Sequence, residues 1–369
     1  MNFSRESNNF FIQWLRSLDK IILIFLILWI SFGLIFNINS TLGFTSERLY
    51  NDPNFLIKKY YLFIFTGSII IILSSFFNES FYKKFSKFFF ITSLLFLLST
   101  LFFGIEAKGS KRWLSIFFFN FQPVELLKPS LIIFLSSIFS SNNVFISKFI
   151  WSGFISLLSV FILLLQPDYT QAILILIIWF TLIFMSGLNL FIIFSLSGLV
   201  VCVMIAILIF FKENFLYIFN RFDNWLSSTN ISYQSEKSMD AIHHGGFFGK
   251  GIGEGILKEK IPEAHTDYIL ASISEEFGII SIILILMIVF SLFMRVFAIC
   301  QTEISSFKKY TLVSLSTIIL LQIFINVGVT INLLPPTGMT FSYLSYGGSS
   351  IITSSFMMGI ILALTKVKN

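Results

Sequence analysis

The strongest constraint on this sequence is a set of ten windows of about 17 to 27 mostly apolar residues, the length that a helix needs to cross a hydrocarbon core of roughly 30 Å. They lie near residues 20–37, 59–77, 88–104, 122–140, 149–166, 169–187, 189–211, 267–294, 310–332 and 347–365. Because 56% of the residues are hydrophobic and only 12% are charged, a soluble surface could not cover these windows. The sequence therefore predicts an all-α integral membrane protein with ten transmembrane helices, folded as a single polytopic domain over residues 1–369.

The distribution of basic residues indicates the orientation of these helices. An even number of spans places both termini on one side of the membrane, and with the termini inside, the inner segments are denser in Lys and Arg than the outer ones. Both termini are therefore predicted to be cytoplasmic, with one long extracytoplasmic loop over about residues 212–266, between spans 7 and 8. The net charge of +6 comes from clusters at span ends, which favours anchoring at the membrane surface over binding of nucleic acid.

The long outer loop contains a glycine-rich run, GGFFGKGIGEG, at residues 245–255. A phosphate-binding P-loop requires a Lys followed by Ser or Thr, whereas Lys250 is followed by Gly251, so the run does not predict a nucleotide site. Glycines permit positive φ angles and close approach of two backbones. The run therefore fits either a tight connection or a lid over a bulky head group.

Charged and aromatic residues gather at the outer ends of the predicted spans. Residues 106–130 place Lys111, Arg112 and Trp113 at the outer membrane face, and Glu125 and Lys128 one turn apart in the helix that follows. Two further outer connections, QPDYT at 166–170 and LLPPTGMTFSYLSYGGSS at 333–350, are short and polar. Ionisable groups within a membrane segment usually face a cavity or a partner, which predicts one shared outward-facing polar cavity. An interfacial belt at Arg112 and Trp113, and a purely internal Glu125–Lys128 ion pair, remain open as alternatives.

The stretch PEAHTDYILASISEEFG, residues 262–278, is acidic where the chain re-enters the membrane. Asp267 lies at the predicted junction of the outer loop and span 8, where a polar substrate can reach it. Glu275 and Glu276 lie two to three turns deeper, which favours a structural role. The three histidines match no known metal-ligand pattern, so no protein metal site is predicted: His243, His244 and His265. The sequence also lacks the G-x-S-x-G elbow of many serine hydrolases.

Several of these segments together resemble one known family. KRWLSIFFFNFQPVELLK, QPDYTQAILI, GGFFGKGIGEGI, IPEAHTDYILASISEEFG and NLLPPTGMTFSYLSYGGSS, in this order and spacing, are similar to the signature segments of the SEDS (shape, elongation, division and sporulation) family. The resemblance covers nearly the whole chain after the first two spans. Within the family, LLPPTGMT before SYGGSS looks more like the division branch than the elongation branch.

The resemblance implies a ten-span peptidoglycan glycosyltransferase of the cytoplasmic (inner) membrane, located at the division septum. Such an enzyme polymerises lipid II, an undecaprenyl-pyrophosphate glycopeptide, at the outer membrane face. It works beside a class B penicillin-binding transpeptidase and other divisome proteins. Three other readings remain open: a polymerase for elongation and cell shape, a lipid II flippase and a non-catalytic division scaffold.

The chemistry of polymerisation suggests a role for each candidate residue. A sugar hydroxyl attacks an anomeric carbon whose leaving group is a lipid pyrophosphate, so the site needs a base and positive charge near the departing anion. Asp267 is the expected catalytic base, with Glu263 as second choice. Substrate-binding residues are expected to be Lys111, Arg112, Trp113, Glu125, Lys128, Lys250 and His265, with Arg221 as a further cation. No nucleotide cofactor is needed, whereas Mg²⁺ or Mn²⁺ bridging the pyrophosphate is compatible with the chemistry.

Overall fold

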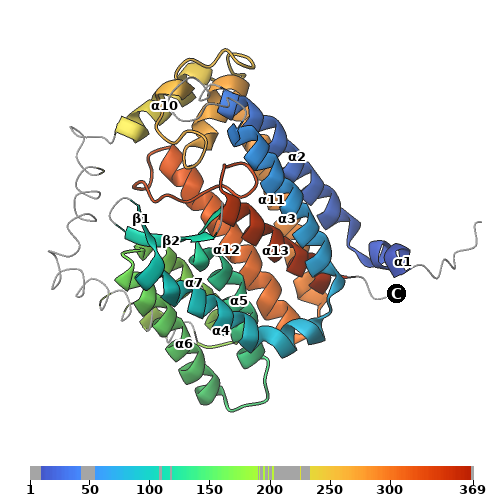
Figure 1. Cartoon of the computed structure of the whole chain (residues 1–369). Helices are drawn as coiled ribbons and strands as arrows, with labels where there is room; N and C mark the ends of the chain where they lie inside the picture. Colours follow the sequence, from blue (N-terminus) through green and yellow to red (C-terminus); the bar gives the residue numbers. More distant parts are fainter. Residues whose placement is uncertain are drawn as a thin grey trace, which may run out of the picture.

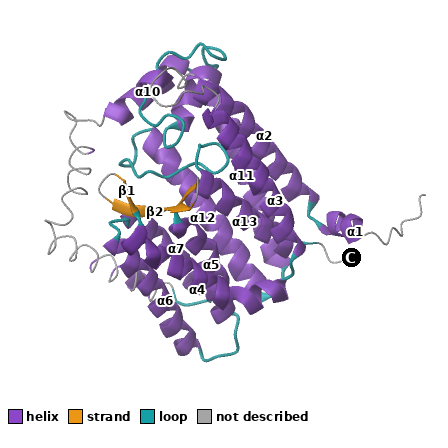
Figure 2. Ribbon diagram, in the orientation of Figure 1, coloured by secondary structure: helices purple, strands orange, loops and turns teal. Residues whose placement is uncertain are grey.

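The computed structural model describes residues 10–42, 55–107, 110–116, 119–189 and 233–366, with a few isolated residues between 190 and 225. Long helices run side by side through the molecule, and a small sheet and several loops gather toward one end (Figure 1; Figure 2). The helices are α1 (Phe10–Ser17), α2 (Lys20–Leu42), α3 (Phe55–Phe76), α4 (Glu79–Phe103), α5 (Pro123–Phe139), α6 (Phe145–Leu165), α7 (Tyr169–Met185), α10 (Tyr233–Gly245), the 3₁₀ turn η2 (Lys258–Lys260), α11 (Ile269–Thr302), α12 (Ser306–Thr330) and α13 (Gly348–Leu364).

The predicted all-α membrane fold is confirmed. Every predicted span except the seventh coincides with a helix, and within the described ranges six helices are long and apolar enough to cross a membrane. Helices α7 and α13 are apolar but shorter. The predicted seventh span, 189–211, lies almost entirely outside the described residues, as do Arg221 and the start of the long outer loop. The total of ten spans and the full extent of that loop therefore stay predictions.

Small residues allow the helices to pack closely. A Cβ atom on Gly67 of α3 would lie 2.6 Å from Ser355 Oγ of α13, and one on Gly359 of α13 would lie 1.8 Å from Ser74 Oγ of α3. In a membrane, where lipid competes equally for apolar surface, helices associate through such close contacts. The α3–α13 pair therefore depends on glycine at both positions.

Ion pairs gather at the end of the bundle that is predicted to be cytoplasmic. Arg295 of α11 pairs with Asp19 at the start of α2 (Nη2–Oδ2, 2.8 Å), and Lys308 of α12 pairs with Glu303 (Nζ–Oε2, 3.2 Å). Nearby, Lys366 Nζ donates to the Phe76 carbonyl oxygen at 3.2 Å. These contacts join the ends of several helices at one membrane face.

The predicted orientation can be tested by thiol labelling in intact cells. Single cysteines replacing Lys84 and Lys309 should resist a membrane-impermeant thiol reagent, because both positions lie at the predicted cytoplasmic end. A cysteine replacing Glu254, which is exposed in the outer loop, should react. Lysed cells, in which all three positions should react, provide the control. If only the cysteines at positions 84 and 309 were labelled in intact cells, the orientation would be the reverse of the predicted one.

Helix α11 is broken at Gly278, and the glycine-rich run fills the break. Gly278 has φ 78° and ψ 169°, which interrupts the hydrogen bonds that Ile279 and Ile280 would otherwise donate one turn back. Instead, Ile279 N–H donates to Gly246 O (3.0 Å) and Ile280 N–H to Phe247 O (3.3 Å). The carbonyls left over on α11 are also bonded to the run: Lys250 N–H donates to Glu275 O (2.9 Å) and Gly251 N–H to Glu276 O (3.0 Å).

The break requires glycine because two backbones meet there. A Cβ on Gly249 would lie 2.1 Å from Glu276 O, and one on Gly278 would lie 2.1 Å from Phe247 O. Both residues also have φ near +80°, which disfavours other amino acids. The glycine-rich run is thus a tight connection held against α11, the first of the two interpretations left open by the sequence.

A three-stranded antiparallel sheet follows α4 and was not predicted. Its strands are β1 (Ile105–Ala107), β2 (Ser110–Ile116) and β3 (Phe119–Phe121), in the order β1-β2-β3. The sheet is tied to α13 by Ser349, whose hydroxyl accepts from Gln122 N–H (3.1 Å) and donates to Asn120 O (3.3 Å). It places Arg112 and Trp113 at the end of the bundle that is predicted to face outward.

Candidate active site

A cavity of about 350 Å³ lies where the sheet, α5, the 166–170 hairpin and two outer loops meet. The segments that the sequence predicted to share an outward-facing cavity are thus brought together. Its lining residues are Ser110, Arg112, Trp113, Gln122, Glu125, Asp168, Gln171, Gln234, Glu263, Thr266, Asp267, Pro336, Thr337, Gly338, Met339, Thr340, Tyr346, Gly347, Ser349 and Ser350. Most of these side chains are polar, so the cavity suits a hydrophilic group such as a sugar or a phosphate.

Asp267 lies just before α11 and lines the cavity. Its side chain is half-buried, and a Cβ on Gly338 would be 3.8 Å from Asp267 Oδ2. Glu263, the second-choice base, lines the same cavity and has φ 59°, in the left-handed region that is rare for residues other than glycine. Backbone strain of this kind often accompanies functional sites. Asp267 and Glu263 therefore share the cavity, which Glu125 and Asp168 also line.

A buried asparagine that sequence reasoning missed links the backbone of Asp267 to the loop that contains Met339. Asn326 of α12 donates from Nδ2 to the Asp267 carbonyl oxygen (2.9 Å) and to the Met339 carbonyl oxygen (2.6 Å). Because its side chain is almost fully buried, these bonds are shielded from competing water. Asn326 thus fixes the Asp267 backbone relative to the 336–340 loop. A polar residue inside an apolar helix was the available sequence signal.

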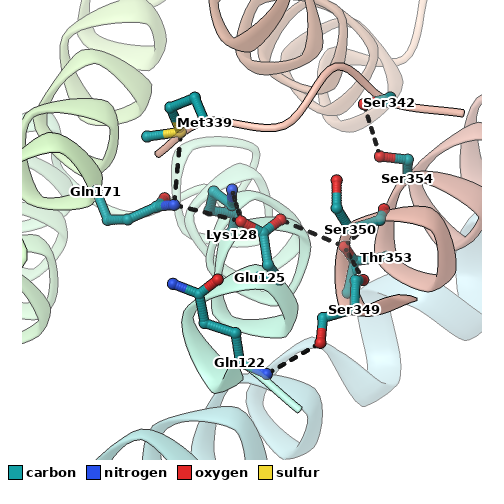
Figure 3. A network of polar contacts seen from close by, with 10 residues as sticks. All are labelled: Gln122, Glu125, Lys128, Gln171, Met339, Ser342, Ser349, Ser350, Thr353 and Ser354. Carbon is teal, nitrogen blue, oxygen red and sulfur yellow. Dashed lines mark hydrogen bonds and ion pairs between the residues drawn. The ribbon is translucent and has the colours of Figure 1, made fainter. Parts of the chain in front are cut away.

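Glu125 and Lys128 form a buried ion pair beneath the cavity (Figure 3). Lys128 Nζ lies 2.7 Å from Glu125 Oε1, and its side chain is fully buried. Gln171 Nε2 donates to the same oxygen at 3.3 Å, while Thr353 Oγ1 donates to Oε2 at 3.4 Å. Glu125 lines the cavity, as expected of a substrate contact, whereas Lys128 does not line it and serves as the internal partner of Glu125.

Arg112 is the only cation among the described residues that line the cavity. Its guanidinium donates to Pro167 O and, from Nε, to Gln166 O (3.4 Å), and Nη1 lies 3.7 Å from Asp168 Oδ1. Burial raises the pKa of Asp168, while the nearby Arg112 guanidinium opposes that shift. Arg112 therefore secures the outer hairpin and, being only half-buried, also presents positive charge to the cavity.

Three other expected substrate contacts do not line the cavity. Lys111 is exposed on β2 and is not among the residues that line the cavity. Lys250 is exposed on the glycine-rich run, whose backbone is bonded to α11. His265 instead packs near the Tyr346 ring (centroids 5.9 Å apart), its carbonyl oxygen accepts from Tyr346 N–H (2.8 Å), and burial lowers the pKa of its imidazole. The cavity thus holds fewer cations than expected.

Glu275 and Glu276 bind the glycine-rich run and the residues just after it, and they do not line the cavity. Glu275 is fully buried and accepts from Leu257 N–H (2.8 Å) and Lys258 N–H (2.7 Å), with His244 Nδ1 3.0 Å away. Glu276 forms a buried ion pair with Lys258. The structural role favoured by the sequence agrees with this geometry. Across the described part of the chain, no group of three or more His, Cys, Asp or Glu side chains is arranged to hold a metal.

Comparison with known proteins places this fold and cavity in a family. A family model described as a cell cycle protein of the FtsW, RodA and SpoVE group matches residues 19–369. Among curated relatives, a protein of Saccharophagus degradans named as a probable peptidoglycan glycosyltransferase FtsW is 31% identical, covering 95% of this chain and 93% of its own length. A Geobacter protein with the same name is 32% identical, covering 93% and 95%.

Solved structures share the fold. A chain from a structure described as showing how a peptidoglycan synthase complex coordinates polymerisation and crosslinking superposes with a TM-score of 0.76, at 22% identity, covering 95% of this chain and 98% of that one. The rod shape determining protein RodA of Thermus thermophilus superposes with a TM-score of 0.70, also at 22% identity, covering 95% and 97%. With the family model matched over almost its whole length, this chain belongs to the FtsW/RodA/SpoVE family of cell cycle proteins.

Proposed function

We propose that this chain is a peptidoglycan glycosyltransferase that polymerises lipid II at the outer face of the cytoplasmic membrane, in septal synthesis during cell division. The curated relatives support the activity and the division role, since those compared above are named FtsW glycosyltransferases. The observation that carries the proposal is the half-buried Asp267 carboxylate, which shares a polar cavity with the Arg112 guanidinium. A base and a cation in one cavity are the two groups that the reaction requires.

The proposed reaction exchanges one bond for another. The acceptor 4-hydroxyl attacks the anomeric carbon of the donor sugar, the new glycosidic C–O bond forms, and the bond from that carbon to the pyrophosphate oxygen breaks. Asp267 takes the proton of the attacking hydroxyl, and Arg112 stabilises charge on the departing lipid pyrophosphate. Because the energy comes from the substrate's own pyrophosphate linkage, no nucleotide is consumed.

A divalent cation and the protein partners complete the proposal. Mg²⁺ or Mn²⁺ usually binds through one or two carboxylates together with substrate phosphates, and Asp267 or Glu263 would be the carboxylate on this chain. A class B penicillin-binding transpeptidase and other divisome proteins are the proposed partners at the septum. The likeness to a chain of a peptidoglycan synthase complex is compatible with such a partnership.

Polymerisation in detergent tests this function against its alternatives. The purified protein, given lipid II in detergent, should produce glycan strands that lysozyme digests. A flippase or a non-catalytic scaffold would produce none, because flipping requires a membrane and a scaffold has no chemistry. The assay should be run with and without the cognate transpeptidase, whose crosslinking activity is blocked. Absence of polymer in both reactions would overturn the proposed function.

A further inference from the structure

The glycine-rich run and Ile256, the residue after it, present large apolar side chains at the surface. Phe247 is 70% exposed, Phe248 84%, Ile252 67% and Ile256 65%, although all four belong to a polar outer loop. We call these four residues the apolar rim. Lys250, which is also exposed, lies between Phe248 and Ile252 in the sequence. Large exposed apolar clusters outside a membrane span commonly mark a surface that contacts lipid or protein.

The backbone of this run is fixed in position. It is inserted in the α11 break through the bonds that Ile279 and Ile280 donate to Gly246 O and Phe247 O. Its far end is held by Glu275, which accepts from the Leu257 and Lys258 backbone N–H groups. The apolar rim is therefore exposed on an anchored surface rather than by fraying of a loop.

The depth of the break places the rim at the outer edge of the hydrocarbon core. Arg295, paired with Asp19 at the start of α2, marks the cytoplasmic end of the span. From Gly278 to Arg295, a rise of ~1.5 Å per residue gives about 26 Å, close to the roughly 30 Å of a hydrocarbon core. Residues 278–295 of α11 thus cover most of the core, and the break at Gly278 lies near its outer edge.

The rim also continues a surface that faces lipid. Just below the break, Ile280 is 43% exposed and Ile283 49%, as expected for the lipid-facing side of a transmembrane helix. Because Ile280 N–H bonds to Phe247 O, the rim begins next to this surface. Figure 1 shows α10 and the loops after it at the end of the bundle where α2 finishes.

We propose that the apolar rim inserts into the outer leaflet of the membrane. Aromatic and aliphatic side chains at this depth would pack among the upper parts of the lipid chains, and the Lys250 ammonium would reach the lipid phosphates. The insertion holds residues 269–277, and with them the cavity wall that carries Asp267, at a fixed height above the bilayer. The occupant of this surface is thus lipid, and the inference does not depend on the enzymatic activity.

Fluorescence quenching in vesicles tests this insertion. In a background with Cys202 and Cys300 replaced by Ala, a single cysteine at Phe248 would carry an environment-sensitive fluorophore, and the protein would be placed in phosphatidylethanolamine–phosphatidylglycerol vesicles. Spin-labelled lipid, with its label high on the acyl chain, should quench this fluorophore strongly, as expected for a side chain at the interface. Aqueous iodide should quench it weakly. A cysteine at the exposed Glu259 is the matched control and should show the reverse pattern.

Two results would overturn the proposal. Strong iodide quenching at Phe248 without quenching by lipid would place the rim in water. Shielding from iodide that arises only when the transpeptidase is added would assign the rim to a protein partner. If the Phe248 variant does not fold, a cysteine at Ile252 gives an independent probe and should show the same lipid quenching.

Discussion

Replacing Asp267 by Asn is expected to lower the rate of lipid II polymerisation about 10²- to 10⁴-fold, the usual contribution of a positioned base. Asn has nearly the same size and can still form hydrogen bonds, but it cannot accept the proton of the attacking hydroxyl. The Asn326 side chain bonds to the backbone carbonyl of Asp267, so this link survives the substitution. The initial rate in detergent, at saturating lipid II, is the measurement.

The equivalent carboxylate-to-amide substitution at Glu263 provides the matched control. Glu263→Gln also converts a carboxylate of the cavity to an amide, and it should reduce the rate much less than Asp267→Asn. Membrane abundance and elution on size exclusion should be unchanged in both variants. A near-normal rate for Asp267→Asn, with a large loss for Glu263→Gln, would move the role of base to Glu263.

Replacing Lys258 by Met is expected to destabilise the protein by about 3–5 kcal/mol, the usual cost of removing one partner of a buried ion pair. The Lys258 and Glu276 side chains are almost completely buried, and Glu276 also accepts from Gly253 N–H at 3.3 Å. Without the ammonium, Glu276 would retain a buried charge that only a backbone N–H group offsets. The midpoint of unfolding of the detergent-solubilised protein should fall clearly.

Two further variants separate charge from packing in this experiment. Adding Glu276→Gln to Lys258→Met removes the remaining charge and should recover part of the lost stability. Lys237→Met removes a partly exposed Lys that pairs with Asp240 at 2.9 Å, and it should leave the midpoint almost unchanged. If Lys258→Met behaved like Lys237→Met, the buried pair would not anchor the glycine-rich run.

The membrane spans could be predicted because the bilayer dictates their length and polarity. An apolar window must be helical to satisfy its backbone within lipid, so α7 and α13 were found within two residues of their observed bounds. Their ends were less accurate where amphipathic residues extend a helix beyond the core. Helix α4 begins at Glu79 rather than near residue 88, and α11 continues to Thr302 rather than ending near 294.

The short sheet and the α11 break could not be predicted, because neither has a local signal of sufficient length. Strands β1 and β3 have three residues each, too few for a period-two pattern to be distinguished from the apolar runs around them. The break depends on hydrogen bonds between the glycine-rich run and α11, which lie far apart in the sequence, such as Lys250 N–H to Glu275 O. The glycines indicated an unusual backbone conformation, but they did not indicate that α11 is the segment to which this backbone bonds.

The candidate site was predicted in part. Arg112, Trp113, Glu125 and Asp267 do meet at one cavity, because motifs of a family mark the segments that converge. Lys128 does not reach it. The direction of a single side chain depends on strand alternation, helix phase and burial, which a sequence motif does not specify.

The central claim is that lipid II binds in the cavity beside Asp267, and thiol protection tests it most directly. A single cysteine replacing Thr340, which lines the cavity, would be placed in the background with Ala at positions 202 and 300, and its rate of modification by a water-soluble thiol reagent would be measured. Saturating lipid II should slow this modification strongly, and the modified protein should lose polymerisation. A cysteine at Ile304, which is 91% exposed on the side predicted to be cytoplasmic, should react at the same rate with or without lipid II. Equal rates of modification at position 340 with and without saturating lipid II would contradict the account.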